Sequence, residues 1–254
     1  MKVRILGCGT STGVPKIGNE WGACDPSEPR NYRLRTSIMV ESAGNRMLVD
    51  CGPDLRQQLL AAEVNPLDGV IVTHAHGDHC HGIDELRPVS QAIGGPVPLY
   101  ARPDVLEELQ QRFAYAFERS EFYRPIVEAL DLGQELVFGN TRVRFVDQPH
   151  GNTSSLGLRF GEGIYSVGYA VDFSSLNDEM SELYEGVDVW IADCLTRKPH
   201  PTHMNLDAVL AAARDLRVGA LYLVHMGNGL DYRTLVAELP DWAAPAYDGL
   251  EIAL

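Results

Sequence analysis

The segment Thr73–His79, which reads THAHGDH, restricts the chemistry of this chain more than any other feature. It directly follows the apolar run GVIV at 69–72, which is typical of a buried strand. Three imidazoles and a carboxylate lie within its last six residues, and both groups are usual ligands of Zn²⁺, Mn²⁺ and Fe²⁺. A strand would send alternate side chains to opposite faces, so we expect a loop in which Gly77 permits a turn toward a second ion. A histidine-rich surface loop is the alternative, but such a density and order of ligand types is rare by chance.

The rest of the chain alternates between two kinds of pattern. Runs rich in Val, Ile, Leu or aromatic residues predict strands at 2–6, 36–41, 47–50, 70–73, 141–146, 155–160, 164–171, 187–192 and 221–224. Helical patterns cover 53–62, 103–117, 175–184, 206–215 and 232–239. Pro53 suits a first helical turn, Ser174 or Ser175 could cap the next helix, and the GEG at 161–163 predicts a hairpin. Helices that alternate with strands indicate one layered α/β domain over 1–254.

Composition and charge exclude several classes of protein. The chain has 254 residues, an apolar fraction of 45% and a charged fraction of 22%, as in an ordinary globular protein. No apolar run approaches the length of a membrane helix, and the first residues resemble a strand more than a signal peptide. Five irregularly spaced cysteines do not suggest a disulfide framework. We therefore expect a cytoplasmic protein without membrane contact; its oligomeric state is left open, a homodimer included.

The net charge narrows the choice of partner. A formal charge of −14 argues against general nucleic-acid binding, which requires a basic face. It does not argue against a small anionic substrate, because two divalent cations make a site locally positive whatever the global charge.

The pattern His-x-His-x-Asp-His after a strand resembles the signature of the metallo-β-lactamase superfamily, and the resemblance extends over nearly the whole chain. The segment MLVDCG at 47–52 looks like the second strand of that family, in which the aspartate, here Asp50, supports a ligand histidine. The opening LGCGTSTGVP at 6–15 and the late KPHPTH at 198–203 are most similar to PhnP-type phosphodiesterases, which open a ribosyl 1,2-cyclic phosphate. The resemblance implies an αββα four-layer sandwich with metals at one edge.

The same resemblance implies a set of metal ligands for two divalent ions, Mn²⁺ or Zn²⁺, with Fe²⁺ as a further candidate. Each of the later ligands follows a predicted strand, as expected if loops at one sheet edge form the site. The first ion is assigned His74, His76 and His150, the second Asp78, His79 and His225, and Asp172 is assigned to both. Asp193 also ends a predicted strand and competes with Asp172 for the bridging position. The spacing from His150 favours Asp172, so we expect Asp193 to support the site from behind the ligands.

The catalytic candidates are Asp78, Asp172 and His203. A water between the ions would lose a proton near neutral pH and attack the phosphoryl group, and His203 matches the histidine that protonates the leaving alkoxide in PhnP-type enzymes. Without that match, His203 would be an ordinary residue at a helix start. His200 has no counterpart and is assigned to the loop, while Arg197 and Lys198 could attract a substrate phosphate or simply be solvated.

The chain also departs from its relatives. Some PhnP-type enzymes hold a structural zinc with several early cysteines and a histidine three residues after the last ligand. Here that early stretch offers only Cys24, and the late position is Asn228, so we predict that this zinc site is absent. The remaining cysteines are expected to be buried or close to the site, and they are Cys8, Cys51, Cys80 and Cys194.

Two functional classes compete with a small-molecule phosphodiesterase. A tRNA 3′-processing endonuclease of the same fold is the first, but it needs a protruding basic arm and a His-x-Glu-Ala-Thr element. The chain shows no basic insertion and reads ADCLT at 192–196. A β-lactamase or thioesterase fits the end segments less well. A non-catalytic binding module is the second class, and such proteins commonly lose ligands, whereas all seven are present here.

Overall fold

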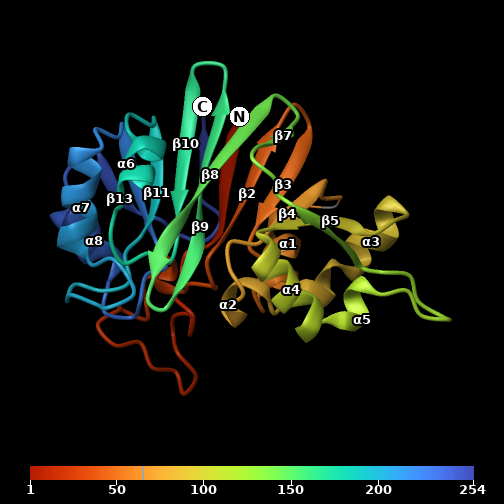
Figure 1. The fold of residues 1–254 in the computed structure, drawn as a ribbon. Helices are drawn as coiled ribbons and strands as arrows, with labels where there is room; N and C mark the ends of the chain where they lie inside the picture. The colour runs from red at the N-terminus through yellow and green to blue at the C-terminus, as the bar shows by residue number, and fades with distance from the viewer. Residues whose placement is uncertain (65) are drawn as a thin grey trace.

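Two mixed sheets packed face to face form the centre of the molecule (Figure 1). The computed structural model describes residues 1–64 and 66–254. Within them the first sheet has the order β14 (Glu251–Ala253), β1 (Lys2–Gly7), β2 (Ser37–Ser42), β3 (Asn45–Val49), β4 (Gly69–Ile71), β5 (Val97–Ala101) and β6 (Val127–Asp131). The second has the order β13 (Ala243–Pro245), β12 (Ala220–Val224), β11 (Val189–Asp193), β10 (Tyr165–Ala170), β9 (Thr153–Glu162), β8 (Thr141–His150) and β7 (Leu136–Phe138).

Helices cover the outer face of each sheet (Figure 1). Beside the first sheet lie α1 (Leu55–Ala62), α2 (Gly77–Cys80), α3 (Arg87–Ile93), α4 (Pro103–Arg112) and α5 (Ala114–Phe117). Beside the second lie α6 (Asp178–Tyr184), α7 (Leu206–Asp215) and α8 (Tyr232–Glu238). Short 3-10 helices occupy Pro29–Asn31 and Ile83–Leu86. Across residues 1–64 and 66–254, no helix combines the length and apolarity that crossing a membrane requires.

The hydrophobic core has two parts. One lies between the sheets and joins side chains such as Ile5 and Val40 to Leu158 and Tyr169, and it continues under α6 and α7. The other fills the space between the first sheet and its helices, around residues such as Leu99. Burial of one such side chain contributes roughly 1.5–3 kcal/mol. Helix, sheet, sheet and helix thus form four layers, which confirms the predicted αββα sandwich.

The strand directions bring distant residues to one edge. Strands β10, β11 and β12 are parallel, and β8 runs the same way because β9 is antiparallel to both β8 and β10. Their carboxyl ends therefore meet at one edge of the second sheet. His150 ends β8, Asp193 ends β11, and Asp172 and His225 follow β10 and β12 closely. This arrangement explains how ligands spread over the second half of the chain can share one site.

Several predicted helix boundaries were wrong. Helix α1 begins at Leu55 instead of position 53. The cap of α6 is Asn177, whose side chain accepts a hydrogen bond from the backbone N–H of Met180, whereas the hydroxyl of Ser174 donates to the carbonyl of Pro149. The expected helix at 103–117 divides into α4 and α5 at Phe113, whose φ of −122° is not helical.

Glycine has different roles at two positions of the chain, Gly163 and Gly77. The predicted hairpin is confirmed, because Glu162 pairs with Tyr165 and leaves Gly163 and Ile164 as the two-residue turn. Gly163 has a φ of 61°, which glycine adopts without strain. Gly77 acts differently from the expectation: it begins the short helix α2, and a Cβ there would lie 2.9 Å from the ring of His81. A larger residue at position 77 would therefore require the exposed ring of His81 to move.

Candidate metal centre

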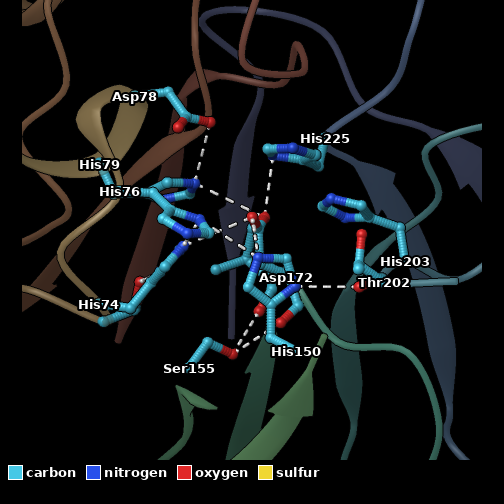
Figure 2. Close-up of polar contacts among 12 residues, drawn as sticks. His74, His76, Asp78, His79, His150, Ser155, Asp172, Thr202, His203 and His225 are labelled. Atoms are coloured by element: carbon cyan, nitrogen blue, oxygen red, sulfur yellow. Dashed lines mark hydrogen bonds and ion pairs between the residues drawn. The ribbon is translucent and has the colours of Figure 1, made fainter. Parts of the chain in front are cut away.

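All seven predicted ligands lie together at the sheet edge (Figure 2). They form two groups of donor atoms, and the atoms within each group lie within 4.8 Å of one another. One group consists of His74, His76, His150 and Asp172, and the other of Asp78, His79, Asp172 and His225. The loop after β4 thus supplies ligands to both groups, and the ends of β8, β10 and β12 supply the rest.

Asp172 is shared by the two groups, one oxygen to each. Its Oδ2 lies 3.5 Å from Nε2 of His74 and 3.4 Å from Nε2 of His150. Its Oδ1 lies 3.5 Å from Nε2 of His79 and 3.2 Å from Nδ1 of His225. A carboxylate that bridges two cations needs this disposition of its oxygens.

Unpaired polar atoms in the buried part of the site fit divalent cations. Nε2 of His79, Oδ1 of Asp172 and Nδ1 of His225 are buried and make no hydrogen bond in the described structure. Buried polar atoms are almost always paired. Three unpaired atoms on residues of the same donor group therefore indicate a missing partner. Imidazole nitrogens and a carboxylate oxygen are the donors that Zn²⁺, Mn²⁺ and Fe²⁺ accept.

Neighbouring groups fix the orientation of the ligand rings. Asp50 accepts a hydrogen bond from Nδ1 of His79 at 2.8 Å and another from the backbone N–H of Thr73 at 2.8 Å. His150 donates through Nδ1 to the carbonyl of Thr202 at 2.9 Å. In both histidines the Nε2 atom is left to face the centre. Such partners orient metal-binding imidazoles and increase their basicity.

The backbone is strained at three positions of the site. Asp50, Asp172 and His225 have φ values of 64°, 52° and 56°, in the left-handed region that L-residues avoid. Each such residue costs on the order of 1–3 kcal/mol. All three lie within two residues after the end of a strand. The chain therefore turns sharply there and directs their side chains inward.

The electrostatics favour cation binding. Burial lowers the pKa of His150 and of His225 to about 4, so both rings are neutral at pH 7 with a lone pair available. Burial alone would raise the pKa of Asp172, but the nearby rings of His225 and His79 outweigh it and hold that pKa well below its usual range. The centre therefore presents two neutral imidazoles, those of His150 and His225, near a charged carboxylate. Burial lowers the pKa of His79, but the charges of Asp172 and Asp50 outweigh it and raise that pKa well above its ordinary value.

His203 lies at the rim of the centre and is held by Asp193. Its Nδ1 lies 2.8 Å from Oδ2 of Asp193, which is fully buried. Its ring stacks on that of His225, with centroids 5.0 Å apart and planes 11° apart. Burial lowers the pKa of His203, but the hydrogen bond and charge of Asp193 outweigh this, and the pKa is raised. Asp193 thus contacts His203 at the rim of the centre. Unlike Asp172, it does not belong to both ligand groups.

A hollow of about 370 Å³ opens above the centre. Five of its lining residues were not predicted from the sequence, namely Ser11, Gly151, Asn152, Thr153 and Thr202. Two signals were available in the sequence: the Gly-rich opening contains Ser11, and the pair Gly151-Asn152 after His150 is typical of a turn. Thr202 gave no local signal, since its contact with His150 spans 52 residues.

The other polar residues considered from the sequence do not line this hollow. Arg197 forms an ion pair with Glu238 at 2.7 Å, and Lys198 is exposed on the same loop. The ring of His200 lies 5.3 Å from that of His203 but is itself exposed. Among the described lining residues there is neither a lysine nor an arginine.

The five cysteines are free and buried, and for the four other than Cys24 this agrees with the expectation. Near Cys24, the region expected to lack a zinc site holds the buried guanidinium of Arg33. Arg33 donates to the carbonyls of Leu230 at 2.6 Å and Gly227 at 3.2 Å, and to the side-chain oxygen of Asn31 at 3.2 Å. It therefore ties the long first loop to the segment that follows His225.

Curated relatives match the chain over different lengths. An octanoyltransferase of Porphyromonas gingivalis is 30% identical over 99% of this chain, but the match covers 51% of that protein. A ribonuclease Z of Bradyrhizobium diazoefficiens is 30% identical over 53% of the chain and 46% of that enzyme. The chain thus spans about half the length of these relatives.

A family model and a solved structure cover most of the chain. The model described as a β-lactamase superfamily domain matches residues 45–226. The crystal structure of a diphosphatase from the PhnP family superposes with a TM-score of 0.90 at 35% identity, over 99% of this chain and 96% of that one. This chain therefore belongs to the β-lactamase superfamily, has the metallo-β-lactamase fold and resembles the PhnP family.

Proposed function

We propose that the protein is a dinuclear metal-dependent phosphodiesterase that hydrolyses a small phosphodiester, such as a cyclic ribosyl or nucleotide-like one. The position of Asp172 supports this most directly, because its two oxygens face two separate sets of donors. When bound, two divalent cations would activate water and neutralise charge on the phosphoryl oxygens. The donor set fits Mn²⁺, Zn²⁺ and Fe²⁺.

The remaining steps, metal binding and proton transfer, are assigned to residues of the chain. The first-group histidines and the second-group residues would hold the cations, with Asp172 facing both groups of donors. His203, anchored by Asp193, is placed at the open side to deliver a proton to the leaving alkoxide. The raised pKa of His203 keeps it in its acid form closer to neutral pH.

The hollow supports a small substrate of low charge. Its volume of about 370 Å³ suits a nucleotide-sized molecule, and beyond the proposed metal ligands and His203 its lining offers hydroxyl and amide groups, including Ser11 and Asn152. A diester carries one negative charge at the reacting group, which the cations can meet. A second phosphate would find no lysine or arginine among the described lining residues.

A turnover screen of the metal-loaded protein tests this function. The screen compares cyclic phosphates, alkyl and p-nitrophenyl diesters, a phosphomonoester, a pyrophosphate diester, a lactam and a thioester, with Mn²⁺, Zn²⁺ or Fe²⁺. We expect diesters to be cleaved fastest. The pyrophosphate diester is included because the similar PhnP-family protein is a diphosphatase, and the thioester because one relative is an octanoyltransferase. Faster monoester or thioester cleavage under every metal would contradict the proposal.

The ribonuclease Z relatives favour one second candidate, a tRNA 3′-processing endonuclease. Their match covers only about half of the chain, and the net charge of −14 opposes tRNA binding. Cleavage of a precursor tRNA at a rate well above that of small diesters would favour this candidate. Release of one defined 3′ fragment would separate it from trace nuclease contamination.

A further inference from the structure

Three arginines line a second hollow, at the end of the second sheet opposite the metal centre. This hollow has a volume of about 400 Å³, and its charged lining residues are Arg142, Arg144 and Arg159. Arg144 lies six positions before His150 on the same strand. At about 3.3 Å per residue these positions are roughly 20 Å apart. The arginine hollow is therefore separate from the metal centre.

The grouping of these charges is unfavourable without a partner. Arg144 and Arg159 lie directly opposite each other on β8 and β9, and Arg142 lies two residues along on the same face. Like charges in directly opposite positions destabilise a pair of strands. The chain as a whole carries a charge of −14, so this cluster is a local exception on an acidic protein.

Arg142 and Arg159 form polar contacts within the protein, which leaves Arg144 available for a ligand. Arg159 donates to the carbonyl of Leu183 at 3.0 Å and lies 3.3 Å from the hydroxyl of Ser166. Arg142 forms an ion pair with Glu135 at 3.1 Å. For Arg144, the part of the chain that the structure describes contains no ion-pair partner. The nearby carboxylate of Asp188 accepts hydrogen bonds from Ser166.

The floor of the hollow is open because it contains glycine. Gly161 pairs with Arg142 across the strands, and a Cβ added there would meet nothing closer than the carbonyl of Arg142 at 3.9 Å. Asn140 and Tyr165 add neutral polar groups at the sides. Guanidinium groups bind phosphate oxygens in pairs, through two parallel N–H bonds. We propose that the arginine hollow binds a phosphate dianion, either inorganic phosphate or the terminal phosphate of a small phosphomonoester.

The test records amide NMR spectra of the Zn²⁺-loaded protein during titration with inorganic phosphate. We expect saturable shifts of the amides of Gly161, Gly163 and Ser166. These report on the arginine hollow, while the amide of Gly151 reports separately on phosphate at the metal centre. A parallel titration with a nucleoside monophosphate distinguishes the two sources, because tighter binding than phosphate alone would indicate an organic ligand.

Matched variants make the test specific. Arg144→Gln should weaken phosphate binding at the hollow by roughly tenfold or more, the usual effect of losing one charge-assisted contact. Arg56→Gln removes the same charge from an exposed position of α1 and should leave this binding unchanged. Gly161→Phe should block the hollow while all three arginines remain. If the Gly161→Phe variant does not fold, the result for Arg144→Gln, a substitution at an exposed position, decides the test.

Three outcomes would overturn the proposal. These are the absence of saturable shifts at the hollow, equal shifts with chloride at the same ionic strength, and undiminished phosphate binding in Arg144→Gln. An equal loss in Arg56→Gln would likewise show that general charge attraction explains the binding.

Discussion

Replacement of His203 by alanine tests the proposed proton transfer. The ring lies at the rim of the hollow with Nδ1 engaged by Asp193 at 2.8 Å, so only Nε2 can face a leaving group. A positioned acid contributes about a hundred- to ten-thousand-fold to departure of a poor leaving group, or roughly 3–5 kcal/mol of barrier. A p-nitrophenolate leaves as a stable anion and needs little protonation. The variant should therefore lose most of its activity on alkyl or cyclic diesters and retain much of it on the p-nitrophenyl ester.

The assay is a series of diesters whose leaving groups differ in basicity, with metal content measured for each preparation. The loss in kcat should grow with leaving-group basicity, and metal content should remain unchanged because His203 is not among the seven proposed ligands. His200→Ala is the matched control, since this neighbouring histidine is exposed and lies outside the hollow. A uniform loss across leaving groups, or a fall in metal content, would refute the role of His203 as an acid.

The pH profile provides an independent check on the same residue. Asp193 raises the pKa of His203 against the opposing effect of burial. Asp193→Asn removes that charge, so the acid form of His203 should be lost at lower pH. The limb at which alkyl-diester turnover falls with rising pH should therefore move to lower pH, while the p-nitrophenyl reaction keeps its profile. An unchanged limb would indicate that another group supplies the proton.

Further predictions concern the metal centre and its support. Asp172→Ala should lower the occupancy of both ions in elemental analysis, whereas Asp193→Ala should leave it largely intact; the reverse would move the bridge to Asp193. Asp50→Asn should weaken metal binding about ten- to a hundredfold in chelator competition, since Asp50 orients His79. Removal of metal should lower the melting temperature, and readdition at a hundred times Kd should restore about 2.7 kcal/mol; equal melting curves would contradict it. Arg33→Met should cost on the order of 3 kcal/mol in urea unfolding, because it leaves buried oxygens unpaired, and an unchanged midpoint would show that Arg33 is not needed.

The local sequence pattern was sufficient to predict the helices and strands that depend on residues close in sequence. Helix α7 starts and ends at the predicted residues, with Asn205 as a cap that accepts from the N–H of Ala208. Strands with a continuous apolar run, such as β11 and β12, were also found. The short strands β5, β6, β7, β13 and β14 were missed, because none of them contains an apolar run of four or more residues.

By itself, the sequence determined the type of chemistry. A dense histidine motif after a strand, followed by single ligands after later strands, specifies donor types and their order, and these are properties of the chain alone. Tertiary structure decided how the donors are used. Asp172 and Asp193 look alike in sequence, and only the parallel strands β10 and β11 place one between two ligand groups and the other behind His203. Contacts such as those of Thr202 with His150, or of Arg33 with Leu230, join residues 52 and 197 positions apart. No local pattern encodes them, because they exist only once both sheets have formed.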